Sequence, residues 1–351
     1  MPHVTADHLT EIARALLIAA GTPESEANTI SGLSVAANLA GHDSHGIILI
    51  PTYIDRVKVG HIVPGAPWTI VEETPTTTVV DGNWGFGYVV TKKAMELTIE
   101  KAEKQNVAAC TVSRQGHIGR LAAYPLMAAQ RGMIAMITAD SGRSPKHVAP
   151  FGGAKARLGT NPICFAMPSN LEGPLFFDMA TSAAAAGKIG VAIARGEQVP
   201  QGWLIDSEGK PSVDPRVLRQ GGALLPLGGG EGYKGYGLAA IVEIFSGLLT
   251  GLGFGVEPSG RHNDGCFMAV FKVSAFRNLE TFKQEVTDFA KYLKDTPPAE
   301  GFKQVYYPGE VEFVKEQDRR KNGIPIEDAT WGVLKKLATE FGIAGKLGLA
   351  D

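Results

Sequence analysis

Two short segments place histidine beside glycine and small polar residues. The first reads HDSH at residues 42–45 and runs directly into GIILI, and the second reads GHIG at residues 116–119. An imidazole with an ordinary pKa of about 6.5 can take or give a proton near neutral pH. Taken singly, each histidine is more often a hydrogen-bonded turn residue, and Asp43 or Ser44 can simply cap a helix. Together, the two segments make His45 and His117 candidates for acid–base chemistry.

Other chemistry for these residues is less well supported. A zinc site built from His42 and His45 lacks a third and fourth ligand at any familiar spacing, so we predict no metal. Asp178 follows an apolar run and precedes two hydroxyl residues, and Lys234 lies between aromatic residues and glycines ahead of an apolar segment. Such positions suit phosphate groups, although a helix cap and a solvated turn lysine are the ordinary alternatives.

The common nucleotide-binding loops are absent from the sequence. No G-x-G-x-x-G lies between a strand and a helix, and no GxxxxGK[ST] occurs. A Rossmann domain and a P-loop are therefore not predicted. If a dinucleotide binds, another backbone arrangement must hold its phosphates.

Composition narrows the class of protein. The 351 residues carry 34 Lys and Arg against 36 Asp and Glu, a balance without the basic excess of a nucleic-acid-binding protein. No apolar run is long enough for a membrane span, and the N-terminus lacks the pattern of a secretory signal. We therefore expect a cytoplasmic protein without nucleic-acid or membrane partners. The three cysteines are far apart among aliphatic residues, which predicts buried, reduced thiols.

The elements that must position the candidate residues alternate between helix and strand. Hydrophobic periodicity predicts helices at 5–20, 24–40, 47–59, 91–106, 122–130, 236–249, 281–293 and 327–340. Strands are predicted after residue 70 and at 107–115, 133–139, 163–167, 176–180 and 266–273. The helix at 236–249 is apolar almost all round and is expected to be buried, and 266–273 is expected to be a central strand. The pattern predicts an α/β fold with a mixed sheet.

Helices at both ends of the chain enclose the sheet-rich middle. We expect the two termini to share one helical subdomain, with residues 1–70 and 281–351 as its two parts. Residues 71–280 would then form the domain that binds cofactor and substrate.

Eight motifs occur in an order that resembles the type-2 malate/L-lactate/L-sulfolactate dehydrogenase family over essentially the whole chain. They are DSHGI, GHIG, APFGG at 149–153, LGTNPICFAMP at 158–168, DMATS at 178–182, KGYGL at 234–238, YYPGE at 306–310 and NGIPI at 322–326. The family also includes ureidoglycolate dehydrogenases, diketogulonate reductases and cyclic imino acid reductases. The resemblance implies a non-Rossmann dinucleotide-binding fold, NAD or NADP as cofactor, and a homodimer with its active site near the subunit boundary.

The same resemblance implies roles for individual residues. His45 matches the family's acid/base, with Ser44 and Asp178 in its hydrogen-bond network, and His117 matches a second histidine that some members use as proton acceptor. The implied cofactor contacts are Ser141, Asp178, Met179, Ala180, Thr181, Ser182, Lys188, Lys234, Gly235, Pro308, Gly309 and Glu310.

One departure from the family pattern concerns the substrate. The arginine that many members use to pair with a substrate carboxylate is replaced here by Leu49, while the tyrosine four residues later is kept as Tyr53. Guanidinium suits a bidentate carboxylate partner. We therefore expect Arg143 to bind the carboxylate, with Arg120 as the second choice and a solvated loop arginine as the alternative reading.

These observations predict an NAD(P)-dependent oxidoreductase that interconverts a small 2-hydroxy acid and its 2-oxo acid. An NADPH-dependent imine reductase acting on a cyclic or N-methyl imino acid needs the same histidine and hydride geometry and is the alternative. A catalytically silent relative that binds a metabolite or dinucleotide is the second alternative, because the arginine is missing at Leu49. The sequence decides neither the substrate nor NAD against NADP.

Overall fold

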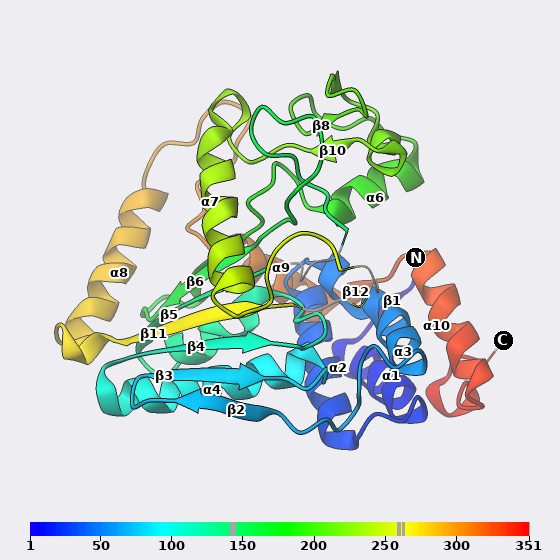
Figure 1. Cartoon of the computed structure of the whole chain (residues 1–351), viewed down its shortest axis with the longest axis horizontal. Helices are drawn as coiled ribbons and strands as arrows, with labels where there is room; N and C mark the ends of the chain where they lie inside the picture. The colour runs from blue at the N-terminus through cyan, green and yellow to red at the C-terminus, as the bar shows by residue number, and fades with distance from the viewer. Residues whose placement is uncertain (141–144, 258–260, 262–263, 351) are drawn as a thin grey trace.

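A mixed β-sheet lies at the centre of the molecule. The computed structural model describes residues 1–140, 145–257, 261 and 264–350. Within these residues one sheet has the strand order β2-β3-β4-β11-β5-β6-β7 (Figure 1). The strands are β2 Thr69–Glu73, β3 Thr77–Asp81, β4 Val107–Ser113, β5 Met133–Ala139, β6 Ile163–Met167, β7 Leu175–Met179 and β11 Cys266–Lys272. β3 and β4 run parallel, and the other neighbours run antiparallel. The predicted mixed α/β architecture is confirmed.

The strand predicted to be central occupies the middle of this sheet. β11 pairs with β4 on one side and β5 on the other, with Met268 opposite both Cys110 and Ile137. Helices α4 (Gly87–Gln105) and α5 (Pro125–Ala129) pack with these strands. All three cysteines are buried and free, as predicted.

α4 begins four residues earlier than the helical pattern indicates. Gly87, Tyr88 and the residues after them are buried at its first turn. A Cβ at Gly87 would overlap the carbonyl oxygen of Gly116. The glycine therefore lets the start of α4 lie directly against the GHIG segment.

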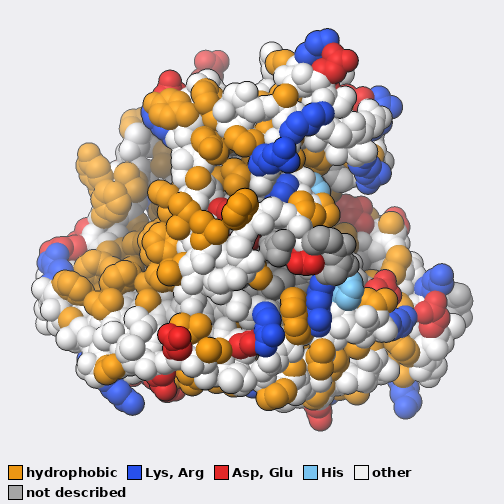
Figure 2. Space-filling model, viewed as in Figure 1, with side chains coloured by type: hydrophobic (Ala, Val, Ile, Leu, Met, Phe, Trp, Pro, Cys, Tyr) orange, Lys and Arg blue, Asp and Glu red, His pale blue; other side chains and the backbone are white. Residues whose placement is uncertain are grey.

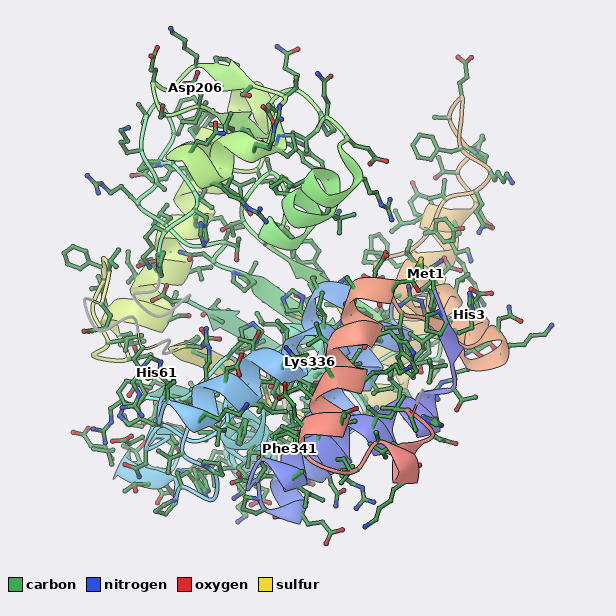
Figure 3. The ribbon with its side chains drawn as sticks, turned by 90° about the vertical axis from the view of Figure 1, so that its right-hand side faces the viewer. Met1, His3, His61, Asp206, Lys336 and Phe341 are labelled. Atoms are coloured by element: carbon green, nitrogen blue, oxygen red, sulfur yellow. The ribbon has the colours of Figure 1, made fainter. Side chains whose placement is uncertain are left out.

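Both ends of the chain contribute to a second, helical cluster. The short strands β1 (His3–Val4) and β12 (Ile324–Pro325) pair, with His3 opposite Pro325. One hydrophobic cluster joins α1 (Ala6–Ala19), α2 (Glu24–Leu39) and α3 (Ile50–Lys58) to α10 (Asp328–Glu340). Figure 3 shows α10, with Lys336 and Phe341, lying across the N-terminal helices. The predicted helical part formed by both termini is present.

Two more C-terminal helices lie outside that cluster. Ala290 of α8 (Leu279–Lys294) packs with Leu175 of β7 and with Tyr307 rather than with the terminal helices. α9 (Glu310–Asn322) follows the YPGE turn and contacts α2. The boundaries expected at residues 70 and 280 remain predictions.

A smaller lobe follows β7 and was not predicted as separate elements. Its short strands have the order β10-β8-β9. These are β8 Leu204–Ile205, β9 Pro211–Ser212 and β10 Ala223–Leu224, and they pack with α6 Ala186–Arg195 through a cluster of its own. Figure 3 shows this lobe, with Asp206 at its tip, projecting from the sheet.

The expectation that the helix at 236–249 is buried is wrong. α7 spans Tyr233–Glu243 and continues as a π-helical segment, η6, at Ile244–Leu248. Ile241, Ile244 and Leu249 are each at least half exposed. Figure 2 shows hydrophobic side chains gathered over α7 and between α7 and α8. Apolar residues all round a helix predict burial, but nothing among the described residues of this chain covers this side.

No helix in the described part of the chain is sufficiently long and apolar to cross a bilayer.

Candidate active site

The DSHG segment is held at the C-terminal end of α2 by side chains from two helices. It forms a single 3₁₀ turn, η1, at Asp43–His45. Asn38 of α2 donates to Asp43 Oδ1 at 2.7 Å and accepts from the Ile47 N–H at 2.8 Å. Arg319 of α9 forms a two-pronged ion pair with Asp43 at 2.7 and 2.9 Å. This fixed turn directs the His45 side chain away from the helical cluster and toward the sheet.

The glycine after His45 has a packing reason. A Cβ at Gly46 would overlap the Asn38 side-chain amide. The segment GIILI then enters the helical cluster, where Ile47 and Ile50 are buried. Leu49 packs against that cluster as well. The polar cluster therefore lies next to an aliphatic run because one side of the turn faces the site and the other faces the core.

The GHIG segment leaves the C-terminal end of β4, next to the start of β11. The buried Asp264 accepts from the Ile118 N–H at 3.1 Å. Gly119 has a φ of +72°, and a Cβ there would overlap the Tyr88 ring. A side chain at this position would be strained by the backbone and blocked by the ring. Asp264 and Tyr88 were not predicted as site residues, although Asp264 stands just before a central strand.

The two histidines, 72 positions apart in the sequence, meet in the structure. Their ring centroids lie 5.8 Å apart and the rings are inclined by only 25°. Ser44 Oγ lies 3.0 Å from His45 Nδ1, and Tyr53 Oη lies 2.8 Å from His117 Nδ1. The structure thus brings together the two predicted acid–base groups and gives each a hydroxyl partner on the same ring nitrogen.

The environment of His45 keeps its imidazole neutral. Burial is the main cause that lowers the pKa of His45 from 6.5 to about 3. The nearby His117, His42 and Arg120 lower this pKa further, whereas Asp264 acts to raise it. His45 can therefore exchange hydrogen bonds at neutral pH without carrying a charge.

Asp178 and Arg120 face each other beside this pair. Asp178 Oδ2 accepts from the Ala122 N–H at 2.8 Å and lies 3.9 Å from Arg120 Nε. Burial raises the pKa of Asp178, although the Ala122 N–H and the Arg120 charge act in the opposite direction. The Arg120 guanidinium also stacks over Phe176, 5.0 Å from its centroid.

Arg120 has hydrogen-bonding capacity that the described residues do not use. Its side chain is only 11% exposed, and Nε and Nη2 are buried without a hydrogen-bond partner in the described part of the chain. An unused buried guanidinium is costly to maintain, so such a group normally meets a ligand or water.

The residue Tyr53, predicted to contact substrate, is 2% exposed and bonds to His117 and Tyr88. Tyr53 is thus linked to the site through His117, and its contact with substrate stays a prediction.

A buried ionic cluster that the sequence analysis missed lies at the end of β5. Lys146 lies 3.4 Å from both Asp140 Oδ1 and Glu243 Oε1, and Asn161 donates to Glu243 at 2.8 Å. Burial and Glu243 raise the pKa of Asp140 to about 7. The sequence signal was a lysine in a loop, which ordinarily indicates a solvated side chain.

The predicted cofactor residues differ in how they are engaged. Thr181 donates to the carbonyls of Thr160 and Asn161, and Ser182 donates to the carbonyl of Ala184. These hydroxyls shape the segment after β7. Met179 ends β7, Ala180 follows it, and both are half-buried. Lys188 is exposed on the first turn of α6. Its neighbour Gly187 lies against Ser44, so a Cβ at Gly187 would overlap the Ser44 side chain.

The remaining predicted cofactor residues lie at two helix starts. Lys234, largely exposed, pairs with Glu231 at 3.2 Å, and a Cβ at Gly235 would overlap the Leu227 carbonyl. Gly309 has a φ of +95° and packs against Phe176, and the Pro308 carbonyl accepts from the Phe176 N–H at 3.2 Å. Glu310 already binds Lys294 and the Tyr307 N–H. Ser141 and Arg143 lie outside the described residues.

Comparison with known proteins shows the family of the chain. The family model for malate/L-lactate dehydrogenase matches residues 4–335. The malate dehydrogenase of Pyrococcus abyssi is 36% identical, over 97% of this chain and 96% of its own. The L-sulfolactate dehydrogenase of Methanocaldococcus jannaschii is 36% identical over 92% of each chain.

The chain belongs to the malate/L-lactate dehydrogenase family. It is therefore an oxidoreductase of the hydroxyacid dehydrogenase type. Among solved structures, malate dehydrogenase from Entamoeba histolytica superposes with a TM-score of 0.93 at 35% identity, over 97% of this chain and 98% of that one. The delta1-piperideine-2-carboxylate reductase from Pseudomonas syringae superposes with a TM-score of 0.85 at 28% identity, over 96% and 100%.

Proposed function

We propose that this enzyme interconverts a small 2-hydroxy acid and its 2-oxo acid. One observation carries the proposal: two stacked histidines lie beside a buried guanidinium whose Nε and Nη2 bind no described residue. Oxidation of a 2-hydroxy acid needs a proton acceptor for the hydroxyl and a cation for the adjacent carboxylate. A bound nicotinamide would supply the third requirement, an acceptor for the hydride.

His117 is the proton acceptor in this proposal, and His45 is a neutral hydrogen-bonding partner. The pKa of His45, lowered to about 3, makes it a weak base. His117 has a buried hydroxyl partner at 2.8 Å on Nδ1, which orients its ring. Ser44 orients His45 in the same way, and Asp178 keeps the Arg120 guanidinium beside the pair.

Arg120 is the proposed anchor of the substrate carboxylate. It contributes buried N–H groups and is close enough for its charge to lower the pKa of His45. The position that holds arginine in many family members is occupied here by Leu49, which packs against the helical cluster. Arg143 remains the alternative anchor, because it lies outside the described residues.

The cofactor is NAD or NADP, and the present residues fit a dinucleotide. Lys234 is largely exposed at the start of α7, where a helix N-terminus favours an anion, and Gly235 lets the Leu227 backbone, which is bonded to Thr181, pack closely against that start. Lys188 on α6 offers a second cation on the Ser44 side.

Replacing Lys234 by alanine should weaken NAD(H) or NADP(H) binding while changing kcat little. An unchanged Kd would remove Lys234 from the cofactor site.

An imine reductase is the second candidate. The Pseudomonas syringae reductase, a structural neighbour, is named for a cyclic imino acid. Such a substrate also carries a carboxylate, so the Arg120 site suits both reactions. The catalytically silent relative is a third reading.

One panel separates these readings. Each of a series of 2-oxo acids and cyclic imino acids is mixed with NADH or NADPH, and the absorbance of the reduced cofactor is followed. Oxidation by oxo acids supports the proposal, and oxidation by imines alone supports the reductase. Cofactor binding without turnover of any compound would identify a silent relative.

The enzyme is proposed to be a homodimer. The exposed apolar side of α7 and η6, which includes Ile244 and Leu248, favours a second copy as its cover (Figure 2). Light scattering should give twice the chain mass for the wild type and a smaller mass for Ile244→Glu with Leu248→Glu. A wild-type monomer at micromolar concentration would refute the dimer.

Three reduced, buried thiols fit the proposed cytoplasmic location.

A further inference from the structure

Two buried tyrosines and the His117 ring form a continuous chain of polar contacts. Tyr88 Oη lies 3.3 Å from the His45 carbonyl oxygen, and Tyr53 Oη lies 3.4 Å from Tyr88 Oη. The last contact joins Tyr53 Oη to His117 Nδ1 at 2.8 Å. Both tyrosines are only 2% exposed, so bulk water cannot replace these partners. The chain begins at one site histidine and ends at the other.

Counting the hydrogens fixes the direction of each contact. A carbonyl oxygen only accepts, so Tyr88 donates to His45. The proton between the two hydroxyls must then come from Tyr53, which donates to Tyr88. Each hydroxyl has one proton, so Tyr53 can meet His117 only as an acceptor. A single arrangement therefore puts a hydrogen in all three contacts, and it requires a proton on His117 Nδ1.

We propose that Tyr53 and Tyr88 are positioning residues that hold neutral His117 in its Nδ1–H tautomer and so leave Nε2 as the proton-accepting nitrogen. This inference rests on the proposed function in assigning His117 as the acceptor. In that reaction the substrate O–H bond breaks and its proton binds Nε2, while the O–H electron pair forms the C=O bond. The hydride leaves the same carbon for the nicotinamide. The Nδ1–H continues to donate to Tyr53 and stabilises the imidazolium that forms.

The surrounding packing keeps the two tyrosines in place. Their rings meet edge to face, with centroids 5.8 Å apart and an angle of 79°. The Tyr88 ring fills the space left by the missing side chain of Gly119. Burial raises the pKa of both hydroxyls, so both keep their protons at neutral pH. The chain of contacts from His45 to His117, called the relay below, is therefore built from two rigid tyrosines whose hydroxyl groups are neutral donors.

The first test measures the tautomer without substrate or cofactor. In protein labelled with ¹⁵N-histidine, long-range ¹H–¹⁵N spectra distinguish the protonated from the unprotonated ring nitrogen, and the His117→Asn spectrum identifies the His117 signals. The wild type should show the proton on Nδ1. A proton on Nε2 in the wild type would overturn the proposal. This result does not depend on turnover, so the inference can fail while the proposed function stands, and the reverse.

The second test compares the kcat values of Tyr88→Phe, Tyr53→Phe and the double variant. In Tyr88→Phe, the Tyr53 proton loses its acceptor and turns to His117 Nδ1, which forces the proton onto Nε2. In Tyr53→Phe, neither tautomer is held. We therefore expect Tyr88→Phe to lower kcat by about tenfold or more with little change in KM, and Tyr53→Phe to lower it less. The double variant should behave like Tyr53→Phe, so that the second substitution partly restores the rate.

A purely structural role predicts a different order. Two tyrosines that only fill space would make the double variant the slowest of the three and would leave the His117 tautomer unchanged. Tyr124→Phe is the matched control, because Tyr124 is fully buried and donates to the Ile118 carbonyl. It should lose stability without altering the tautomer. A tautomer shift in Tyr124→Phe equal to that in Tyr88→Phe would also contradict the relay.

Discussion

The segments around His45 and His117 look alike in sequence but are supported in different ways. His45 stands on a 3₁₀ turn whose hydroxyl partner, Ser44, is exposed. His117 follows a central strand, and its partner Tyr53 is buried and linked to a second tyrosine. Exposed hydroxyls exchange freely with water, whereas buried ones enforce a geometry. This difference favours His117, whose buried partner Tyr53 fixes its ring, as the proposed proton acceptor.

The largest expected effect follows from that assignment. His117→Ala should lower kcat by a factor of about 10²–10⁴, the usual contribution of a positioned acid–base group, while cofactor affinity stays nearly constant. His45→Ala should also impair turnover, by about 10- to 100-fold, because its ring supports the substrate without taking the proton. Steady-state kinetics with the best substrate of the panel measures both. The reverse order of the two variants would transfer the acceptor role to His45.

The next effect concerns Arg120, the cation beside the two histidines. Arg120→Ala should cost about 2–5 kcal/mol in kcat/KM, as expected when one partner of a buried charged pair is removed. Arg120→Lys should rescue little, because ammonium lacks the planar pair of donors that a carboxylate matches. Arg114→Ala is the control, since Arg114 pairs with Asp81 at the surface. If kcat/KM in Arg120→Ala stays within about threefold of wild type, the carboxylate is bound elsewhere, with Arg143 as the next variant to measure.

The lowered pKa of His45 predicts how stability depends on pH. The folded state holds this pKa at about 3, whereas the unfolded chain has the ordinary value of 6.5. As the pH falls, the unfolded state therefore binds a proton at His45 before the folded state does. The contribution of His45 to the free energy of unfolding is complete above pH 6.5 and is lost progressively down to about pH 3. The free energy of unfolding should fall by about 4–5 kcal/mol from this residue over that window. Urea unfolding of wild type and His45→Gln at several pH values measures the difference, and parallel curves would contradict it.

The smallest effect distinguishes the two hydroxyl partners. Ser44→Ala removes an exposed hydroxyl that water can replace, so kcat should fall only a few-fold, by about 1 kcal/mol or less. Tyr53→Phe removes a buried one and should have the larger effect. Comparing the two rates at saturating cofactor tests whether burial of the partner decides its importance. Equal losses would show that it does not.

Local patterns in the sequence determined most of the elements. Apolar spacing marks α1, and in the structure the Thr5 hydroxyl caps this helix by accepting from the His8 N–H. The apolar run at 266–273 marks a strand buried on both faces, and it lies in the middle of the sheet. Helix and strand periods are properties of neighbouring residues, so one sequence is enough to detect them. The short strands of the small lobe escaped because two-residue pairings leave no period to detect. α6, with 10 residues, is long enough to show a helical period and was missed all the same.

Only the tertiary structure decided how the candidate residues meet. His45 and His117 could be singled out by type, but their stacking depends on α2 packing against α4 and on α4 packing against β4. Tyr53 stays a predicted substrate contact, and only packing shows that its hydroxyl lies 2.8 Å from His117 Nδ1. The apolar helix at 236–249 was expected inside, yet its outer side has no cover in the described chain. Burial and contacts between distant residues depend on the whole fold, because each side chain's surroundings come from segments that its own neighbours do not specify.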